Sequence, residues 1–212
     1  MKIYVVRHGE SQWNVENRLQ GSDDSSLTEK GIRDNQELKK YLENSKIIFD
    51  SIYSSQSQRA IETAKTIRGN QTIEIKRQSA LKEMSVGSWQ GMTWPEIKKD
   101  YPIKYYQYWY QPDLYAGNNG GEDFYTVERR VVSFTNQLFQ KKEAENILII
   151  SHGVIIKSML NYLQNRSIKD FWKEPLVSGS SLTLIEKEGQ KIEIRLIEQR
   201  TDLKKSPQIL SE

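Results

Sequence analysis

Residues 2–14 read KIYVVRHGESQWN, and this stretch guides the interpretation of the rest of the chain. Residues 3–6 form a short run of β-branched and aromatic side chains, the pattern of a buried strand. The run ends abruptly at Arg7, His8 and Gly9. Arginine has a planar fork that fits phosphate or carboxylate, histidine can act as nucleophile, acid, base or metal ligand, and glycine permits a tight turn. Taken alone, three such residues often occur together by chance.

A second stretch repeats this arrangement. Residues 147–150, ILII, form another apolar run, and it ends in Ser151, His152 and Gly153. The chain contains two histidines, and each one follows a predicted strand and precedes a glycine. In an open α/β sheet, ligands bind outside the carboxyl ends of the strands. We therefore expect both histidines to face one crevice.

Three stretches together resemble the histidine phosphatase superfamily, which contains the cofactor-dependent phosphoglycerate mutases and many small phosphatases. Residues 5–21, VVRHGESQWNVENRLQG, resemble the opening motif of the family. Residues 52–64, IYSSQSQRAIETA, resemble its second motif, whose arginine aligns with Arg59. In residues 81–91, LKEMSVGSWQG, Glu83 takes the position of the acid–base residue. The resemblance covers nearly the whole chain.

The resemblance implies an α/β fold, a three-layer α/β/α sandwich on a mostly parallel sheet with a helical cap insertion. The hydrophobic pattern agrees, because short apolar runs alternate with amphipathic segments. We expect one domain, residues 1–212, with the cap at about residues 92–125. Beyond the two strands above, the pattern predicts strands at 49–54, 73–75, 180–186 and 191–196, helices at 28–44, 58–67, 123–139 and 154–163, and a loose polar end at 201–212.

Composition narrows the class of protein. The formal net charge of +3 comes from 31 basic and 28 acidic side chains that are spread evenly, and no basic arm favours a nucleic-acid partner. The chain has no cysteine and two histidines, so we expect no metal and no cofactor. No apolar run approaches the roughly 18 residues of a membrane span, and no signal peptide is recognisable. We expect a cytoplasmic monomer or homodimer with no membrane partner.

The chemistry of these residues suits phosphoryl transfer. A phosphate monoester carries roughly two negative charges at neutral pH, and its transfer relies mainly on positioning and charge stabilisation. Arg7, Arg59 and His152 could neutralise those charges. His8 could attack phosphorus, while Glu83 would protonate the leaving oxygen and later take a proton from water. The resemblance implies the same catalytic roles for all five residues and a small phosphorylated substrate.

Five further residues are predicted to bind the substrate. Ser11 and Asn14 lie three positions apart and share a face if this segment is helical, so both could donate hydrogen bonds to an oxyanion. The resemblance places Gln20 and Gly21 beside the substrate and Asn14 in the phosphate pocket. Gly153 lies between the second strand and the helix predicted at 154–163.

The sequence favours a phosphatase over a mutase. In the mutases a tyrosine stands three residues after the acid–base glutamate, but this chain has Val86 there. The mutases also carry an arginine pair in the cap, whereas residues 78–128 contain no arginine. A mutase remains the alternative, and a catalytically silent binding module is an alternative of another class. The eight tryptophan and tyrosine rings of residues 94–115 are expected to pack the cap against the core, with substrate contact as a second possibility.

Overall fold

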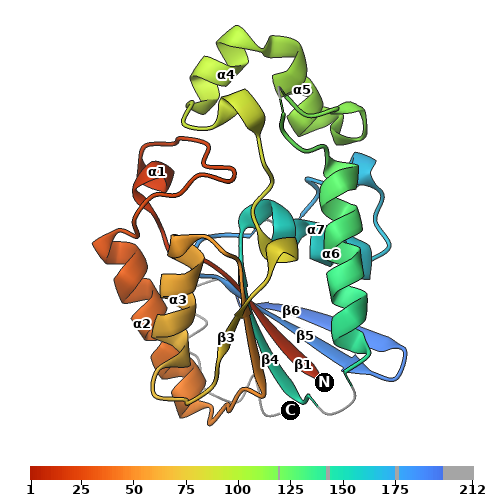
Figure 1. The fold of residues 1–212 in the computed structure, drawn as a ribbon. Coiled ribbons are helices and arrows are strands. Elements are labelled where there is room, and N and C mark those ends of the chain that lie inside the picture. The colour runs from red at the N-terminus through yellow and green to blue at the C-terminus, as the bar shows by residue number, and fades with distance from the viewer. Residues whose placement is uncertain (119, 142–143, 175–176, 198–212) are drawn as a thin grey trace.

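A six-stranded sheet forms the centre of the computed structural model, which describes residues 1–118, 120–141, 144–174 and 177–197 (Figure 1). Its strands lie in the order β3-β2-β4-β1-β5-β6. β1 and β2 both pair in parallel with β4, and β3 pairs in parallel with β2, whereas β5 runs antiparallel to β1 and β6. The mostly parallel sheet is therefore confirmed. The strands are β1 (Lys2–Arg7), β2 (Ser51–Ser54), β3 (Ile75–Arg77), β4 (Asn146–Ser151), β5 (Leu182–Glu188) and β6 (Lys191–Ile197).

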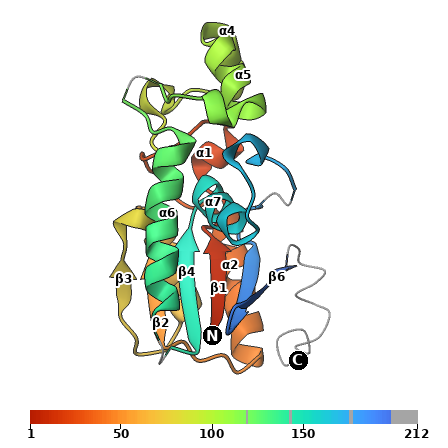
Figure 2. The same cartoon turned by 90° about the vertical axis from the view of Figure 1, so that its right-hand side faces the viewer.

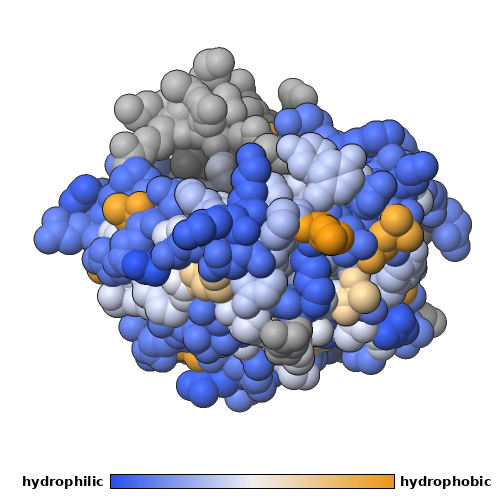
Figure 3. Space-filling model, turned by 90° about the horizontal axis from the view of Figure 1, so that it is seen from above, coloured by the Kyte–Doolittle hydropathy of each residue, from blue (hydrophilic) through white to orange (hydrophobic). Residues whose placement is uncertain are grey.

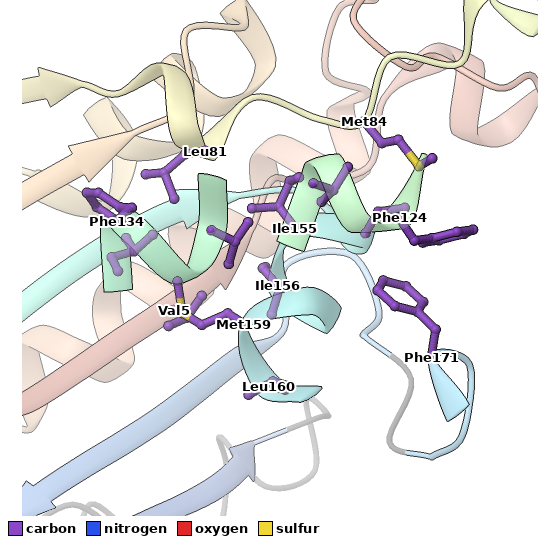
Figure 4. Packing of buried hydrophobic residues seen from close by; sticks show 14 of the residues in the cluster. Val5, Leu81, Met84, Phe124, Phe134, Ile155, Ile156, Met159, Leu160 and Phe171 are labelled. Atoms are coloured by element: carbon purple, nitrogen blue, oxygen red, sulfur yellow. The ribbon is translucent and has the colours of Figure 1, made fainter. Parts of the chain in front are cut away.

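Helices cover both faces of this sheet (Figures 1 and 2). Successive side chains of a strand point to opposite faces, so Ile3 and Val5 join the core on one face while Tyr4 and Val6 join the core on the other. Figure 4 shows Val5 among the side chains of the first core. The first core is completed by α6 (Phe124–Phe139) and α7 (Gly153–Leu163), and the second by α2 (Glu29–Asn44) and α3 (Gln58–Arg68).

This double burial explains why β1 and β4 are continuous apolar runs rather than alternating ones. Ile149, in the middle of β4, is fully buried. Truncating such a side chain to alanine typically costs about 2–5 kcal/mol of stability. The three-layer sandwich predicted for the chain is therefore present. Its two cores lie directly beneath the carboxyl ends of β1 and β4.

Side-chain N-caps begin α2 and α6. The hydroxyl of Thr28 accepts a hydrogen bond from the backbone N of Gly31 at 3.0 Å, and the carboxylate of Asp123 accepts one from the backbone N of Thr126 at 2.6 Å. Caps of this kind contribute about 1 kcal/mol each. Ile32 in α2 is 42% exposed and does not join the core. The buried face of α2 consists of Gly31, Asn35, Leu38, Tyr41 and Leu42.

The strands β2, β3 and β5 each begin two residues later than predicted, at Ser51, Ile75 and Leu182. β3 begins at Ile75, where the predicted strand ended, because its position is set by pairing with Ile52–Ser54 of β2 rather than by its own sequence. β5 begins at Leu182, because Ser180 has a φ of 54°, a left-handed conformation that a strand does not contain. The predicted loose end at 201–212 lies outside the described residues.

The cap stands above the carboxyl edge of the sheet (Figure 1). It contains α4 (Trp94–Asp100), α5 (Pro102–Tyr110) and the short 3-10 helix η3 (Pro112–Leu114). Its aromatic rings pack onto the body, as expected, because the Tyr108 ring lies 5.2 Å from that of Phe124 in α6 and 5.3 Å from that of Trp172. Trp172 also donates a hydrogen bond from Nε1 to the backbone O of Tyr108 at 2.6 Å.

The surface seen from the cap side is mostly hydrophilic, with a few separate hydrophobic residues (Figure 3). Among the helices of the described residues, none is both long enough and apolar enough to span a membrane.

Candidate active site

The ends of β1 and β4 lie level with each other. Arg7 pairs with Ser151 in the parallel ladder, and the backbone N of His8 donates to the backbone O of Ser151 at 3.0 Å. The rings of His8 and His152 consequently lie 5.0 Å apart between their centroids. Two histidines that are 144 positions apart in the sequence thus meet at the carboxyl edge of the sheet.

A cavity of about 690 Å³ opens at this edge. Eight of the ten predicted site residues line it, namely Arg7, His8, Asn14, Gln20, Gly21, Arg59, Glu83 and Gly153. The other two, Ser11 and His152, are fully buried behind the lining residues. The cavity also reaches the cap, which supplies Trp94, Tyr108 and Trp109.

His8 is held in one tautomer. Nε of Arg59 donates to Nε2 of His8 at 3.3 Å, so Nε2 carries the lone pair and the proton resides on Nδ1. Nδ1 in turn donates to the backbone O of Gly9 at 2.7 Å. Burial of the ring, together with the charges of Arg59 and Arg7, holds the pKa of His8 well below its usual value. His8 is therefore neutral at physiological pH, with a lone pair on Nε2.

A close approach of backbones fixes the turn that carries His8. A Cβ on Gly9 would lie 2.8 Å from Nδ2 of Asn35 and 2.9 Å from the backbone O of Gly31, both in α2. The backbone N of Gly9 also donates to Oγ1 of Thr63 in α3 at 3.1 Å. Glycine at this position lets the turn rest directly on two helices, which restricts the movement of His8.

Arg59 is a deeply buried cation of the site, with 1% of its surface exposed. Its Nη1 donates to Oδ1 of Asp24 at 2.9 Å and to the backbone O of Asp23 at 2.6 Å. Its Nη2 lies 3.3 Å from the backbone O of Gly21. A buried guanidinium needs such partners to offset its loss of hydration, and here one loop of the chain supplies them.

His152 contacts the cavity through Arg59 rather than directly. Nη2 of Arg59 lies 3.2 Å from Nδ1 of His152, and a guanidinium can only donate, so Nδ1 accepts. Nε2 of His152 then donates to Oγ of Ser55 at 2.7 Å. Burial, Arg59 and His8 lower the pKa of His152 well below its usual value. In place of the charge neutralisation that we expected, His152 in this arrangement is a neutral ring that orients Arg59.

Ser11 supports Asn14 instead of facing the cavity. Its Oγ and its backbone N both donate to Oδ1 of Asn14, at 3.0 and 3.1 Å. Nε2 of Gln20 donates to Oγ of Ser11 at 2.7 Å, and Oγ of Ser25 donates to Oε1 of Gln20 at 3.2 Å. These bonds occupy the amide oxygen of Asn14 and leave its Nδ2 as a donor toward the cavity. The short helix α1 (Gln12–Val15) holds Asn14 in place.

Arg7 lies against the first turn of α7. Its Nη1 donates to the backbone O of Val177 at 2.6 Å, while its Nε is buried and has no partner among the described residues. A Cβ on Gly153 would lie 3.6 Å from Cζ of Arg7, an ordinary contact distance, so the start of α7 lies next to the guanidinium. The N-terminus of an α-helix and an arginine fork both attract phosphate oxygens.

Glu83 is a carboxyl group with two opposing influences on its pKa. Burial raises the pKa, and this effect exceeds the lowering by the backbone N of Met84, 2.9 Å from Oε1, and by the charges of Arg59 and Arg7. A carboxyl group with a raised pKa retains its proton to higher pH and can act as a general acid.

Sequence reasoning missed one wall of the cavity. Trp172, Val177 and Lys157 line it, and they come from α7 and from the segment between α7 and β5. The adjacent aromatic residues Phe171 and Trp172 were the available signal in an otherwise irregular segment. Sequence reasoning also missed Asp24, which lies in a stretch that reads simply as a turn. Among the described residues, no group of three or more His, Cys, Asp or Glu side chains could hold a metal ion.

Known proteins share this fold and much of this sequence. Phosphoserine phosphatase 1 of Hydrogenobacter thermophilus is 29% identical over 172 residues, which cover 81% of this chain and 80% of that protein. A 2,3-bisphosphoglycerate-dependent phosphoglycerate mutase of Blochmanniella pennsylvanica is 28% identical over 211 residues, covering 85% and 91%. The solved structure of Bacillus stearothermophilus YhfR is 35% identical and superimposes with a TM-score of 0.88, covering 96% of this chain and 99% of that one.

The family model of the histidine phosphatase superfamily (branch 1) matches residues 3–200, which include every strand and helix described above except Lys2, the first residue of β1. The stretches that carried the resemblance lie at the carboxyl edge of the sheet, where they surround one cavity. By the extent of this match, the chain belongs to the histidine phosphatase superfamily.

Proposed function

We propose that this protein hydrolyses small phosphate monoesters through a phosphohistidine on Nε2 of His8. The observation that carries the proposal is the hydrogen bonding of His8, which leaves a lone pair on Nε2 beside two guanidinium groups. A neutral imidazole is nucleophilic, and the charges of Arg7 and Arg59 favour a phosphate dianion next to it.

The reaction would proceed in two steps. Nε2 of His8 forms a bond to phosphorus while the bond to the ester oxygen breaks, and Glu83 gives its proton to that oxygen, so an alcohol departs. Water then attacks phosphorus and passes a proton to the Glu83 carboxylate. The bond from nitrogen to phosphorus breaks, which releases inorganic phosphate and restores His8. Arg7, Arg59 and Nδ2 of Asn14 stabilise the charge on the transferred group.

Trapping the intermediate tests this proposal. After mixing with substrate and quenching without acid, mass spectrometry should locate phosphate on His8. Glu83→Gln should accumulate more of this species than the wild type when the substrate has a good leaving group, because water attack loses its base. Normal phosphate release by His8→Ala would overturn the assignment.

We also propose that catalysis needs no metal ion. Arg7 and Arg59 line the cavity beside His8 and supply the positive charge that a metal would otherwise bring. Activity should survive exhaustive treatment with EDTA. Loss of activity that a divalent ion restores would contradict this part of the proposal.

Hydrolysis is favoured over mutase activity by the side chain of residue 86. Val86 is 2% exposed and lines the cavity where the mutases have a tyrosine, and it packs so closely that a Cβ on Gly21 would lie 2.7 Å from its Cγ2. With no arginine in residues 78–128, the cap offers no fork for a substrate carboxylate. Interconversion of 2- and 3-phosphoglycerate, primed with 2,3-bisphosphoglycerate, should be much slower than monoester hydrolysis. The reverse result would identify a mutase.

The wall opposite the phosphate site favours apolar leaving groups. Trp94, Trp109 and Trp172 line the cavity, with centroid distances of 4.9 Å from Trp94 to Trp109 and 4.7 Å from Trp109 to Trp172. Aromatic faces stack well on planar groups. Phenyl phosphate should therefore show a higher kcat/KM than 3-phosphoglycerate. A protein that binds phenyl phosphate without turning it over would instead be a silent binding module.

A further inference from the structure

One polar group interrupts the aromatic wall of the cavity. Tyr108 in α5 lines the cavity together with Glu83, and its side chain is 2% exposed. Its hydroxyl forms no hydrogen bond with any described residue. Trp94, Trp172 and Met84 also line the cavity and none of them is a strong acceptor, while the Glu83 carboxylate, which is one, forms no hydrogen bond with Tyr108.

The orientation of Tyr108 is fixed by its neighbours. Its ring lies 5.3–5.8 Å from the rings of Trp89, Trp94, Tyr115 and Trp172, measured between centroids. The backbone O of Tyr108 also accepts the hydrogen bond from Trp172. A ring packed on several sides cannot turn its hydroxyl away, so this donor is preorganised.

The hydroxyl lies near the group that would protonate the leaving oxygen. Burial raises the pKa of Tyr108 well above its usual value, and the nearby Glu83 carboxylate raises it further. The phenol therefore keeps its proton at every working pH and acts as a donor. Glu83 would face the ester oxygen. The part of the cavity that Tyr108 and Glu83 both line would therefore hold the first atoms of the leaving group.

We infer that Tyr108 is a specificity-determining residue, whose hydroxyl donates a hydrogen bond to an oxygen of the leaving group near the ester bond. The enzyme then gains affinity for phosphorylated polyols, relative to phosphorylated plain alcohols of equal length. This inference rests on the proposed hydrolase activity. The Tyr108 hydroxyl would add one hydrogen-bond donor to a cavity wall that is otherwise aromatic.

The test compares glycerol 3-phosphate with propyl phosphate in the wild type and in Tyr108→Phe. Both substrates have a three-carbon leaving group, and propyl phosphate lacks the hydroxyls. One neutral hydrogen bond typically contributes a factor of about 3 to 10. Tyr108→Phe should lower kcat/KM for glycerol 3-phosphate by that factor and leave propyl phosphate unchanged. Differences in leaving-group basicity cancel when variant and wild type are compared on the same substrate, and differences in the amount of folded enzyme cancel in the ratio of the two substrates.

Tyr115→Phe is the matched control. Tyr115 packs in the same aromatic cluster, 5.3 Å from the Tyr108 ring, and its hydroxyl is buried without a partner among the described residues. It does not line the cavity. The substrate ratio should therefore stay at the wild-type value in this variant.

Two outcomes overturn the inference while the hydrolase proposal stands. Tyr108→Phe could lower kcat/KM equally for both substrates, which would mean that Tyr108 acts through packing or through the pKa of Glu83. It could also leave both unchanged, which would mean that the hydroxyl touches no substrate. If the wild type hydrolyses neither these substrates nor phenyl phosphate, the proposed function itself fails and the inference fails with it.

Discussion

Oδ1 of Asp24 lies 2.9 Å from Nη1 of Arg59, and the same carboxylate accepts hydrogen bonds from the backbone N of Gln58 and Arg59 at the start of α3. Asp24 thus holds both the buried guanidinium and the helix that carries it. It does not line the cavity, so any effect on catalysis must act through Arg59.

Asp24→Asn should lower kcat/KM for phenyl phosphate by about tenfold, because a hydrogen bond between charged groups contributes about 1.5–3 kcal/mol and part of that is lost to solvent screening. The control is Asp23→Asn, which makes the same change in net charge one residue away. The side chain of Asp23 forms no hydrogen bond with the described residues, although its backbone O accepts from Arg59. An equal loss in both variants would attribute the effect to net charge rather than to the position of Arg59.

Glu83→Gln should slow the enzyme in proportion to how much the leaving group needs a proton. The substitution keeps the size of the side chain and removes proton transfer, which typically costs about 10²–10⁴-fold. The loss should be large for propyl phosphate and clearly smaller for nitrophenyl phosphate, whose leaving group is weakly basic. Equal losses for the two substrates would show that Glu83 binds the substrate without donating a proton.

The pH profile of kcat/KM should identify two groups. The lowered pKa of His8 keeps its imidazole neutral well below pH 6.5, and the raised pKa of Glu83 keeps its carboxyl protonated above pH 4.5. Activity should therefore fall at lower pH as His8 gains a proton and at higher pH as Glu83 loses one. With the same substrate, kcat/KM of Glu83→Gln should no longer show the decrease at higher pH that the loss of the Glu83 proton causes. A profile that keeps this limb unchanged would assign it to another group.

Lys157 should make stability depend on pH in the alkaline range. Burial and the charge of Arg166 lower its pKa from 10.5 to about 8 in the folded protein, although Glu174 acts in the opposite direction. Between these two pKa values the unfolded chain binds more protons than the folded chain, so stability rises with pH. The free energy of unfolding of the wild type, minus that of Lys157→Met, should increase by up to about 3 kcal/mol from pH 8 to 10.5. Urea titrations at three pH values would measure this difference in unfolding free energy. A difference that does not change with pH would show that the pKa of Lys157 is not lowered.

The sequence was sufficient for the groups at the strand ends. His8, Arg7 and Gly153 follow or end apolar runs, and parallel strands bring such ends to one edge, so their meeting follows from topology. Arg59 and Glu83 required the family resemblance, because an arginine in a first helical turn and a glutamate in a loop are commonly surface residues. The fold followed from the same runs, since strands buried on both faces need helices on both sides.

Other features depend on contacts that no local pattern records. The side chain of Ser11 faces away from the cavity because its hydroxyl forms hydrogen bonds with Asn14 and Gln20. His152 lies behind Arg59 because the Arg59 guanidinium extends as far as Nδ1 of the His152 ring. Trp172 reached the cavity because it bonds the backbone of Tyr108, 64 positions away in the chain. These are choices between alternative hydrogen-bond partners, and they are decided by tertiary packing.

The central position of β1 also has a consequence for synthesis. β1 is made first, yet its neighbours β4 and β5 begin at residues 146 and 182. At about 5–20 residues per second, a ribosome needs roughly 10–30 s to supply the first of them. During that interval an apolar strand with two unpaired edges stays exposed, which is a hazard for aggregation. A chain released before residue 146 would carry His8 and Arg59 intact, but without β4 beside β1 they would have no sheet edge on which to meet.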